Sequence, residues 1–241
     1  MSNKTLLTAL AATATLFIAD ESSAYLLNAD LFATTTNNAF PSDAGVMSGA
    51  AATGSAGDVW NDVEIAPLVA STFGGLVDST GAAVAGASIG FDGNHNWGTA
   101  VAPDAAYGGA GVLMADYLVP NAFNGSTTFT ITVPEANTDY TLYLYGVTNF
   151  APQDSRFTVA GANEGAQTVT SPDISGPLTV IEDYVVFTGS TNASGEIVVT
   201  VDSATSDFYA INGFQLDVVP EPSSLALLCL GGLMIAPRRR S

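Results

Sequence analysis

Apolar and polar residues alternate along much of this chain with a period of two, which is typical of β-strands. The clearest case is residues 127–133, where Phe129, Ile131 and Val133 share one face and threonines occupy the other. No window has a convincing helical periodicity. Further segments with the composition of strands are residues 27–33, 59–65, 83–91, 156–160, 184–188, 196–201 and 208–218.

Residues 140–147 are apolar on both faces, which predicts a central strand. A helical turn between sheets is expected at residues 110–117, and a long loop is expected at the Gly-, Ala- and Ser-rich residues 37–57. No repeat of fixed period is present. Short strands separated by Gly, Asn, Asp, Ser and Thr predict one all-β domain, a β-sandwich of the jelly-roll type.

The C-terminus has a different pattern. Pro220, Glu221 and Pro222 precede an apolar run, residues 225–236, which ends at the basic residues Arg238, Arg239 and Arg240. Twelve residues are short for a membrane-spanning helix, which needs about 20. A buried C-terminal helix is disfavoured by two adjacent glycines in the run and by the arginines after it.

This order of motif, apolar segment and basic end resembles the bacterial PEP-CTERM sorting tail. The resemblance implies an exosortase-type membrane protease as a partner. It also implies export, transient anchoring in the inner membrane, and a final location at the cell surface or in the extracellular matrix. The arginines would stay on the cytoplasmic side, because positive charge is retained there.

The N-terminus predicts the same route. Lys4 precedes an apolar stretch, residues 6–19, and Ser22 and Ala24 offer the small residues that signal peptidase reads. Cleavage after Ala24 would make Tyr25 the first residue. The expected organisation is a signal peptide at 1–24, a β-sandwich domain at 25–218, and a sorting tail with a short hydrophobic helix at 219–241.

The domain between the two signals is strongly acidic. The chain has 23 acidic residues, and all but Asp20, Glu21 and Glu221 lie in residues 25–218, which leaves 20 against the single base Arg156, a formal charge near −19. Nucleic acid is therefore excluded as a partner, since its binding depends on clustered Lys and Arg. The acidity fits general solubility of a secreted protein better than one acidic site. The only cysteine, Cys229, lies in the sorting tail, so the domain contains no disulfide.

A second resemblance concerns the domain itself. The segments Gly-Asp-Val-Trp-Asn at 57–61, Leu-Val-Asp-Ser-Thr-Gly at 76–81, Tyr-Thr-Leu-Tyr-Leu-Tyr-Gly at 140–146 and Ile-Asn-Gly-Phe-Gln-Leu at 211–216 are similar to those of galactose-binding-like jelly rolls. The resemblance implies a sandwich that binds carbohydrate through its end loops or one concave face, often with a structural calcium ion.

Residues 92–98 are the candidate cation site. Asp92, Asn94 and Asn96 place oxygen ligands at alternate positions of a tight loop, as calcium loops do. The EF-hand pattern fails, because Trp97 and Pro103 stand where Gly and Glu are needed. An Asp/Asn/Gly turn that closes a hairpin, with His95 exposed, is the favoured alternative.

Aromatic rings next to Asp or Asn are the candidate glycan contacts, because a flat ring can stack on a sugar while polar neighbours bond its hydroxyls. Trp97 and Tyr107 lie in polar segments, and Asp58 and Asn61 flank Trp60. Trp60 itself is expected in the core.

Three further side chains are expected to have structural roles. Tyr143 and Tyr145 are expected to pack between the two layers of the sandwich. Arg156 is expected to form an internal ion pair.

Enzymatic functions find little support. The Gly-x-Ser-x-Gly motif and the P-loop are missing, the domain contains no lysine, and no catalytic residue is assigned. Scattered acids neither reveal nor exclude a glycosidase pair. The sequence predicts a non-enzymatic exported protein that binds or coats exopolysaccharide. The alternatives are a purely structural acidic matrix protein without a defined ligand and a weak glycan-active hydrolase.

Overall fold

The computed structural model describes residues 24–33, 47–66, 68–93, 95–100, 111–120, 125–147, 154–170, 182–204 and 209–219. These residues lie in one compact unit, Ala24–Val219, whereas residues 1–23 and 220–241 are assigned to a second unit. The predicted sorting residues Pro220, Glu221, Pro222, Arg238, Arg239 and Arg240 therefore lie outside the described residues. No helix in the described part of the chain is long and apolar enough to cross a membrane.

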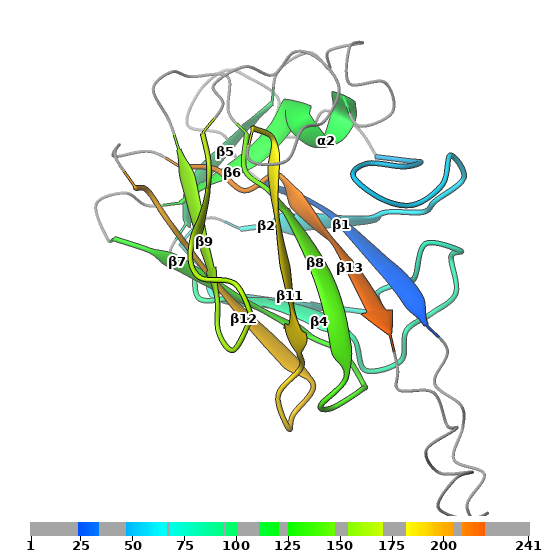
Figure 1. Cartoon of the computed structure of the whole chain (residues 1–241). Helices are drawn as coiled ribbons and strands as arrows, with labels where there is room; N and C mark the ends of the chain where they lie inside the picture. Colours follow the sequence, from blue (N-terminus) through cyan, green and yellow to red (C-terminus); the bar gives the residue numbers. More distant parts are fainter. Residues whose placement is uncertain are drawn as a thin grey trace, which may run out of the picture. The chain divides into compact units, whose positions relative to one another are not determined.

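Two sheets pack face to face in the compact unit (Figure 1). The five-stranded sheet has the order β11-β8-β13-β1-β2, with strands at Tyr184–Ser190, Asp139–Tyr145, Gly213–Val219, Tyr25–Ala33 and Asn61–Ile65. The six-stranded sheet has the order β10-β9-β12-β7-β4-β3, with strands at Gln167–Val169, Ser155–Val159, Glu196–Asp202, Thr127–Thr132, Ser88–Phe91 and Ser71–Gly74.

The chain crosses repeatedly from one sheet to the other. Strands β7, β8 and β9 alternate between the six-stranded and the five-stranded sheet, and so do β11, β12 and β13. Such crossing is typical of the Greek-key connections in jelly-roll sandwiches. The predicted all-β sandwich is confirmed, and the predicted central strand at 140–147 lies inside its sheet as β8.

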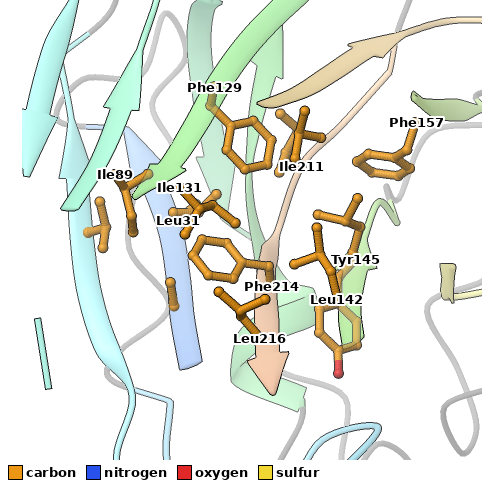
Figure 2. Close-up of a cluster of buried hydrophobic side chains, with 14 of the residues drawn as sticks. Leu31, Ile89, Phe129, Ile131, Leu142, Tyr145, Phe157, Ile211, Phe214 and Leu216 are labelled. Atoms are coloured by element: carbon orange, nitrogen blue, oxygen red, sulfur yellow. The ribbon is translucent and has the colours of Figure 1, made fainter. Parts of the chain in front are cut away.

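The core follows from the alternation along each strand. In β7 the buried residues are Thr127, Phe129 and Ile131, while the threonines between them are half-buried. Phe129 stacks on Phe214 of the opposite sheet, with ring centroids 6.3 Å apart. Figure 2 shows these rings among Ile131, Leu142 and Leu216, all fully buried. Two apolar faces that meet in this way explain the stability of a domain without disulfides.

A smaller layer closes one end of the sandwich (Figure 1). The short helix α2, Gly111–Ala115, leads directly into β6, Asp116–Pro120, which pairs with β5, His95–Ala100. The helix confirms the helical turn predicted at 110–117. The helix packs tightly on β13, because a Cβ at Gly213 would lie 2.7 Å from Leu113 Cδ1. The same Cβ would lie 2.3 Å from the carbonyl oxygen of Ala29 in the neighbouring strand β1.

The expected loop at 92–98 is only partly a loop. Asp92 and Gly93 form a turn, and Gly93 has φ +82 with no room for a Cβ, which would lie 2.6 Å from the Ala70 nitrogen. From His95 onward the chain is strand β5, so the prediction of a loop there was wrong. Alternation was hidden because the register slips between His95 and Trp97, which leaves Asn96 as the extra residue of a bulge.

Candidate functional site

The outer face of the five-stranded sheet carries a row of tyrosines. Leu142 and Leu144 of β8 point into the core, so Tyr143 and Tyr145, between and after them, lie on the opposite face. The prediction that these two tyrosines pack between the layers was wrong. A strand that is apolar on both faces does not by its sequence show which face meets the second sheet.

Tyr145 is buried under a segment that crosses this outer face. Its hydroxyl donates to Gln215 Oε1 at 2.6 Å and accepts from the Ala52 amide at 2.9 Å. Desolvation by burial raises the pKa of this phenol well above its ordinary value, so Tyr145 stays neutral. The two hydrogen bonds fix the hydroxyl of Tyr145 and so hold its ring in place.

Gln215 ties the same segment to two strands. Its Nε2 donates to Asn28 Oδ1 at 2.9 Å and to the Thr53 carbonyl at 3.1 Å, while its Oε1 also accepts from the Thr53 amide at 3.1 Å. Residues 47–58, called the covering loop below, thus lie over β13 and β1. The expected long loop at 37–57 contains no strand in its described part, but that part is packed and bonded to the sheet.

Trp60 fixes the other end of the covering loop. It is 4% exposed, as predicted for a core residue, and its Nε1 donates to the Gly49 carbonyl at 2.8 Å. Asn61, a predicted glycan contact, is next to it but faces the other way. Its Nδ2 donates to the carbonyls of Asn28 and Val77, both at 2.8 Å, and its Oδ1 accepts from the Val77 amide at 2.8 Å. These bonds give Asn61 a structural role.

Beyond the covering loop, the described part of the outer face carries aromatic side chains that are only half-buried, and this part is called the open half below. Tyr143 and the half-buried Tyr184 of β11 lie with ring centroids 6.1 Å apart at an interplanar angle of 49°. Tyr184 also rests against the fixed ring of Tyr145, with centroids 5.6 Å apart. Desolvation raises the pKa of Tyr184, so this phenol is neutral at ordinary pH.

A carboxylate lies on the same open face. Asp217 of β13 is paired in register with Thr141 of β8, two positions from the Gln215–Tyr143 pair. It is half-buried, no hydrogen bond joins its carboxylate to the described residues, and desolvation raises its pKa. Tyr143, Tyr184 and Asp217 are called the tyrosine face below. It combines two apolar rings with one poorly solvated acceptor.

The free edge of β11 is covered from the other sheet. Glu164 Oε2 accepts from the Thr188 amide at 2.7 Å, the Asn163 amide donates to the Thr188 carbonyl at 2.8 Å, and Gln167 Nε2 donates to the Val186 carbonyl. These bonds pair the backbone groups of Val186 and Thr188 that face away from β8, so another strand cannot add to the sheet there. The tyrosine face is thus set between two packed segments on a rigid sheet.

The remaining predicted glycan residues are Asp58, Trp97 and Tyr107. Asp58 accepts from the Ser55 amide at 3.0 Å and so stabilises a turn of the covering loop. Trp97 lies in β5, opposite Val119 in register, and Tyr107 lies outside the described residues. The structure does not bring these residues together into one described site.

The predicted calcium ligands are only partly described. Asp92 is exposed, and its Oδ2 accepts from the Thr128 amide at 2.8 Å, which anchors the turn to β7. The backbone of Asn96 lies in the β5 bulge, and Asn94 lies outside the described residues. Among the residues that the structure describes, no group of three or more His, Cys, Asp or Glu could bind a metal ion.

Arg156 confirms its predicted structural role. Its Nε and one terminal nitrogen donate to the two carboxylate oxygens of Asp202, each at 2.7 Å. The hydrogen bond and charge of Asp202 raise the pKa of the guanidinium further. This base is therefore committed to a neighbouring strand, and the tyrosine face carries acidic character only.

Sequence reasoning missed Tyr184 and Asp217. Both lie in segments whose strands were predicted, 184–188 and 208–218, and the signal was the alternation itself. Val185 and Phe187 are fully buried, which places Tyr184 on the opposite face, and Leu216 and Val218 do the same for Asp217.

Comparison with known proteins adds one decisive observation at the C-terminus. Residues 218–240 match the PEP-CTERM protein-sorting motif. The predicted sorting tail is confirmed, and a PEP-CTERM motif indicates export with transient anchoring in the membrane and sorting by an exosortase. No curated protein matches the chain.

Solved structures give weak similarities. A CBM35 module from Cellvibrio japonicus is 12% identical, with a TM-score of 0.27, and the alignment covers 45% of this chain and 78% of the module. A CBM61 module solved in complex with β-1,4-galactotriose is 13% identical, with a TM-score of 0.28, and the alignment covers 57% of this chain and 90% of the module. Similarities this low assign no ligand to the chain.

Proposed function

We propose that this protein is exported, released at the cell surface or into the extracellular matrix, and there binds a neutral exopolysaccharide through the tyrosine face. The observation that carries the proposal is the pair of half-buried rings, Tyr143 and Tyr184, on the rigid outer face of a sheet. In this proposal the domain acts by binding and has no catalytic role.

The physical support is preorganisation. The Tyr184 ring rests on Tyr145, which is fixed by hydrogen bonds to Gln215 and Ala52. A sugar ring that stacks there would therefore order few side chains, and little of its binding energy would be lost. Aromatic rings with polar neighbours are the usual lining of small-molecule and sugar sites.

The negative charge of Asp217 on the tyrosine face favours neutral glycans over acidic ones. Asp217 can accept hydrogen bonds from sugar hydroxyls, but the loss of its hydration would make a second negative charge nearby costly. The domain has one basic residue, Arg156, which is already paired. A neutral polysaccharide is therefore preferred to one rich in uronic acid.

The test is the thermal unfolding of the Ala24–Val219 unit with a panel of neutral and acidic polysaccharides, each with calcium and with chelator. A partner that binds only the folded state raises the midpoint of unfolding. We expect a shift with one neutral glycan, and we expect Tyr143→Ala and Tyr184→Ala each to weaken binding about tenfold, or about 1.4 kcal/mol. Phe73→Ala is the matched control, a half-buried aromatic on the edge strand β3.

Other outcomes point elsewhere. If Trp97→Ala or Tyr107→Ala abolishes binding while Tyr143→Ala does not, the site includes those residues and not the tyrosine face. If no glycan shifts the midpoint, the purely structural matrix protein is the better account. Cleavage of the bound glycan, followed by its reducing ends, would instead support the hydrolase. A calcium shift lost in Asp92→Ala would support a structural ion bound by Asp92, Asn94 and Asn96.

A further inference from the structure

Strand β3, at one end of the six-stranded sheet, lacks the residues that usually protect an edge strand. Its sequence is Ser-Thr-Phe-Gly, and residues 65–77 around it contain no charged residue. Proteins commonly protect such an edge with charged side chains, proline, a bulge or a covering segment. Strand β3 pairs with β4 in an unbroken register, so no bulge turns it away from solvent. In a domain with a formal charge near −19, this edge is neutral.

The hydrogen bonds of β4 show which of its backbone groups face β3. The Asp92 amide donates to the carbonyl of Thr128, which directly precedes Phe129 in β7. Backbone groups in an antiparallel ladder alternate between the two neighbours of a strand. Counted back from Asp92, every second residue of β4 therefore faces β7, and the residues between them, Phe91 and Ile89, direct their N–H and C=O groups towards β3.

Two residues of β3 consequently direct their backbone groups away from the sheet. Ser71 and Phe73 are the register partners of Phe91 and Ile89, so the N–H and C=O groups of Thr72 and Gly74 point outward. Both residues are exposed, and nothing lies within 4 Å of the position that a Cβ would take at Gly74. No backbone hydrogen bond joins these outward groups to another described segment. Another strand can therefore pair here.

The other edges of the two sheets are less suited to pairing. At the β11 edge, backbone groups of Val186 and Thr188 are already bonded from the opposite sheet. Strand β2 carries the exposed acidic residues Asp62 and Glu64, which would oppose pairing with another acidic chain. Strand β10 has only three residues. Strand β3 is thus the best candidate for strand addition.

Apolar side chains lie at the same edge. Leu68 and Val69, shortly before β3, are 59% and 52% exposed, and they are two of the four large apolar side chains exposed in the described part of the chain. Leu68 also has φ +59, a strained conformation for a residue with a side chain. The half-buried Phe73 packs edge-on against Phe91, with ring centroids 6.5 Å apart, but has no strand on its other side. The edge therefore combines outward backbone groups with exposed apolar surface.

We propose that β3 pairs with β3 of a second copy of this chain, antiparallel across a two-fold axis, and so joins two six-stranded sheets. Thr72 of each copy lies opposite Gly74 of the other, and each such pair exchanges its backbone hydrogen bonds. Phe73 lies opposite Phe73 of the second copy, so the two rings extend the core across the interface. A second copy fits because this edge is complementary to itself and brings no like charges face to face.

The first test is the mass in solution of the Ala24–Val219 unit, which contains every strand of both sheets, without any glycan. Sedimentation equilibrium should show monomer and dimer in exchange. The Kd of the dimer should fall as salt is added, because salt screens the repulsion between two acidic domains. A monomer at every salt concentration, up to about 1 mM protein, would overturn the proposal.

A proline variant tests the pairing itself. Thr72→Pro removes an outward N–H and leaves the ladder with β4 intact, whereas the control Thr72→Val keeps that N–H. Each copy loses one donor in the proline variant, so we expect the Kd to rise about 30-fold, with little change in the control. Thermal unfolding checks that the proline variant is folded. An unchanged Kd in a folded Thr72→Pro would mean that another surface forms the dimer.

A cysteine variant tests the register and does not depend on the proline variant. In the proposed pairing the two copies of residue 73 have Cα atoms about 4.5 Å apart, within the range of a disulfide. The unit has no cysteine of its own, so oxidised Phe73→Cys should form a linked dimer. Glu64→Cys, on the exposed edge strand β2, is the control and should remain monomeric. Equal or greater cross-linking of Glu64→Cys would overturn the proposal.

Dimer formation is independent of glycan binding at the tyrosine face. Strand β3 belongs to the six-stranded sheet, whereas Tyr143, Tyr184 and Asp217 belong to the five-stranded sheet. Phe73→Ala should therefore weaken the dimer and leave the glycan-induced shift of the unfolding midpoint unchanged. Tyr184→Ala should weaken glycan binding and leave the Kd of the dimer unchanged. Loss of the dimer in Tyr184→Ala would contradict the assignment of the interface to β3.

Discussion

The outer face of the five-stranded sheet has two halves, and its side chains are fully buried in one half and only half-buried in the other. The covering loop buries Gln215 of β13, Tyr145 at the end of β8 and Trp60 before β2, and hydrogen bonds satisfy their polar atoms. Farther along β8, and on β11, the rings of Tyr143 and Tyr184 are only half-buried. The strands are neighbours and alternate in the same way, so the difference comes from the loop.

Polar side chains on the outer face of a sheet become part of the core where a loop covers and bonds them, and they stay available to a ligand where it does not. A buried amide or hydroxyl costs stability unless it is bonded, and the covering loop supplies backbone partners for each of them. On the open half the same residue type, tyrosine, keeps its apolar ring near solvent, where a ligand can replace water. Substitutions matched across the two halves should therefore separate stability from binding.

The largest effect is expected at Trp60. Trp60→Ala would empty a buried site and leave the Gly49 carbonyl without its indole donor, so we expect a loss of about 3–5 kcal/mol in the free energy of unfolding. The matched change in the open half, Tyr184→Ala, should cost about 1 kcal/mol, because its ring is only partly buried. Urea unfolding of both variants measures the difference. Equal losses would mean that the covering loop does not make Trp60 more important for stability than the half-buried Tyr184.

Gln215→Ala should come next. It removes four hydrogen bonds to Tyr145, Asn28 and Thr53 and leaves buried partners unsatisfied, for an expected loss of about 2–3 kcal/mol. Two residues along the same strand and face, Asp217→Ala should change stability by about 0.5 kcal/mol or less. Protection of the amides of residues 48–58 from hydrogen exchange should fall only in Gln215→Ala. Unchanged protection would mean that other contacts fix the loop.

The two neighbouring tyrosines of β8 give the finest structural comparison. Tyr145→Phe leaves the Ala52 amide unpaired and should cost about 1–2 kcal/mol. Tyr143→Phe removes a hydroxyl from the open half and should cost about 0.5 kcal/mol or less, while glycan binding, if it depends on the ring, persists. A larger loss for Tyr143→Phe than for Tyr145→Phe would contradict the division of the face into a core half and an open half.

The sequence was sufficient for the strands and for much of the core. Alternation at 127–133, the central position of 140–147 and the burial of Trp60 follow from local patterns. The covering loop could not be predicted, because its role depends on hydrogen bonds between residues far apart, such as Thr53 and Gln215. If the position of the covering loop is not known, the alternation along the strands does not show which half of the outer face is buried. Strand β5 was missed for a related reason, since a bulge interrupts its alternation.

The smallest effect concerns pH and Asp217. Desolvation raises its pKa in the folded state above the ordinary value of 3.8. Above the folded pKa the carboxylate is charged in both states and its partial burial opposes folding; as pH falls towards 3.8 both states become protonated and this penalty disappears. Asp217→Asn should therefore be slightly more stable than the parent at neutral pH, with an advantage that shrinks on acidification. Urea unfolding across this pH range measures it. An advantage that does not change with pH would mean that the Asp217 carboxylate is fully hydrated, and the open half would then lack the poorly solvated acceptor that the preference for neutral glycans requires.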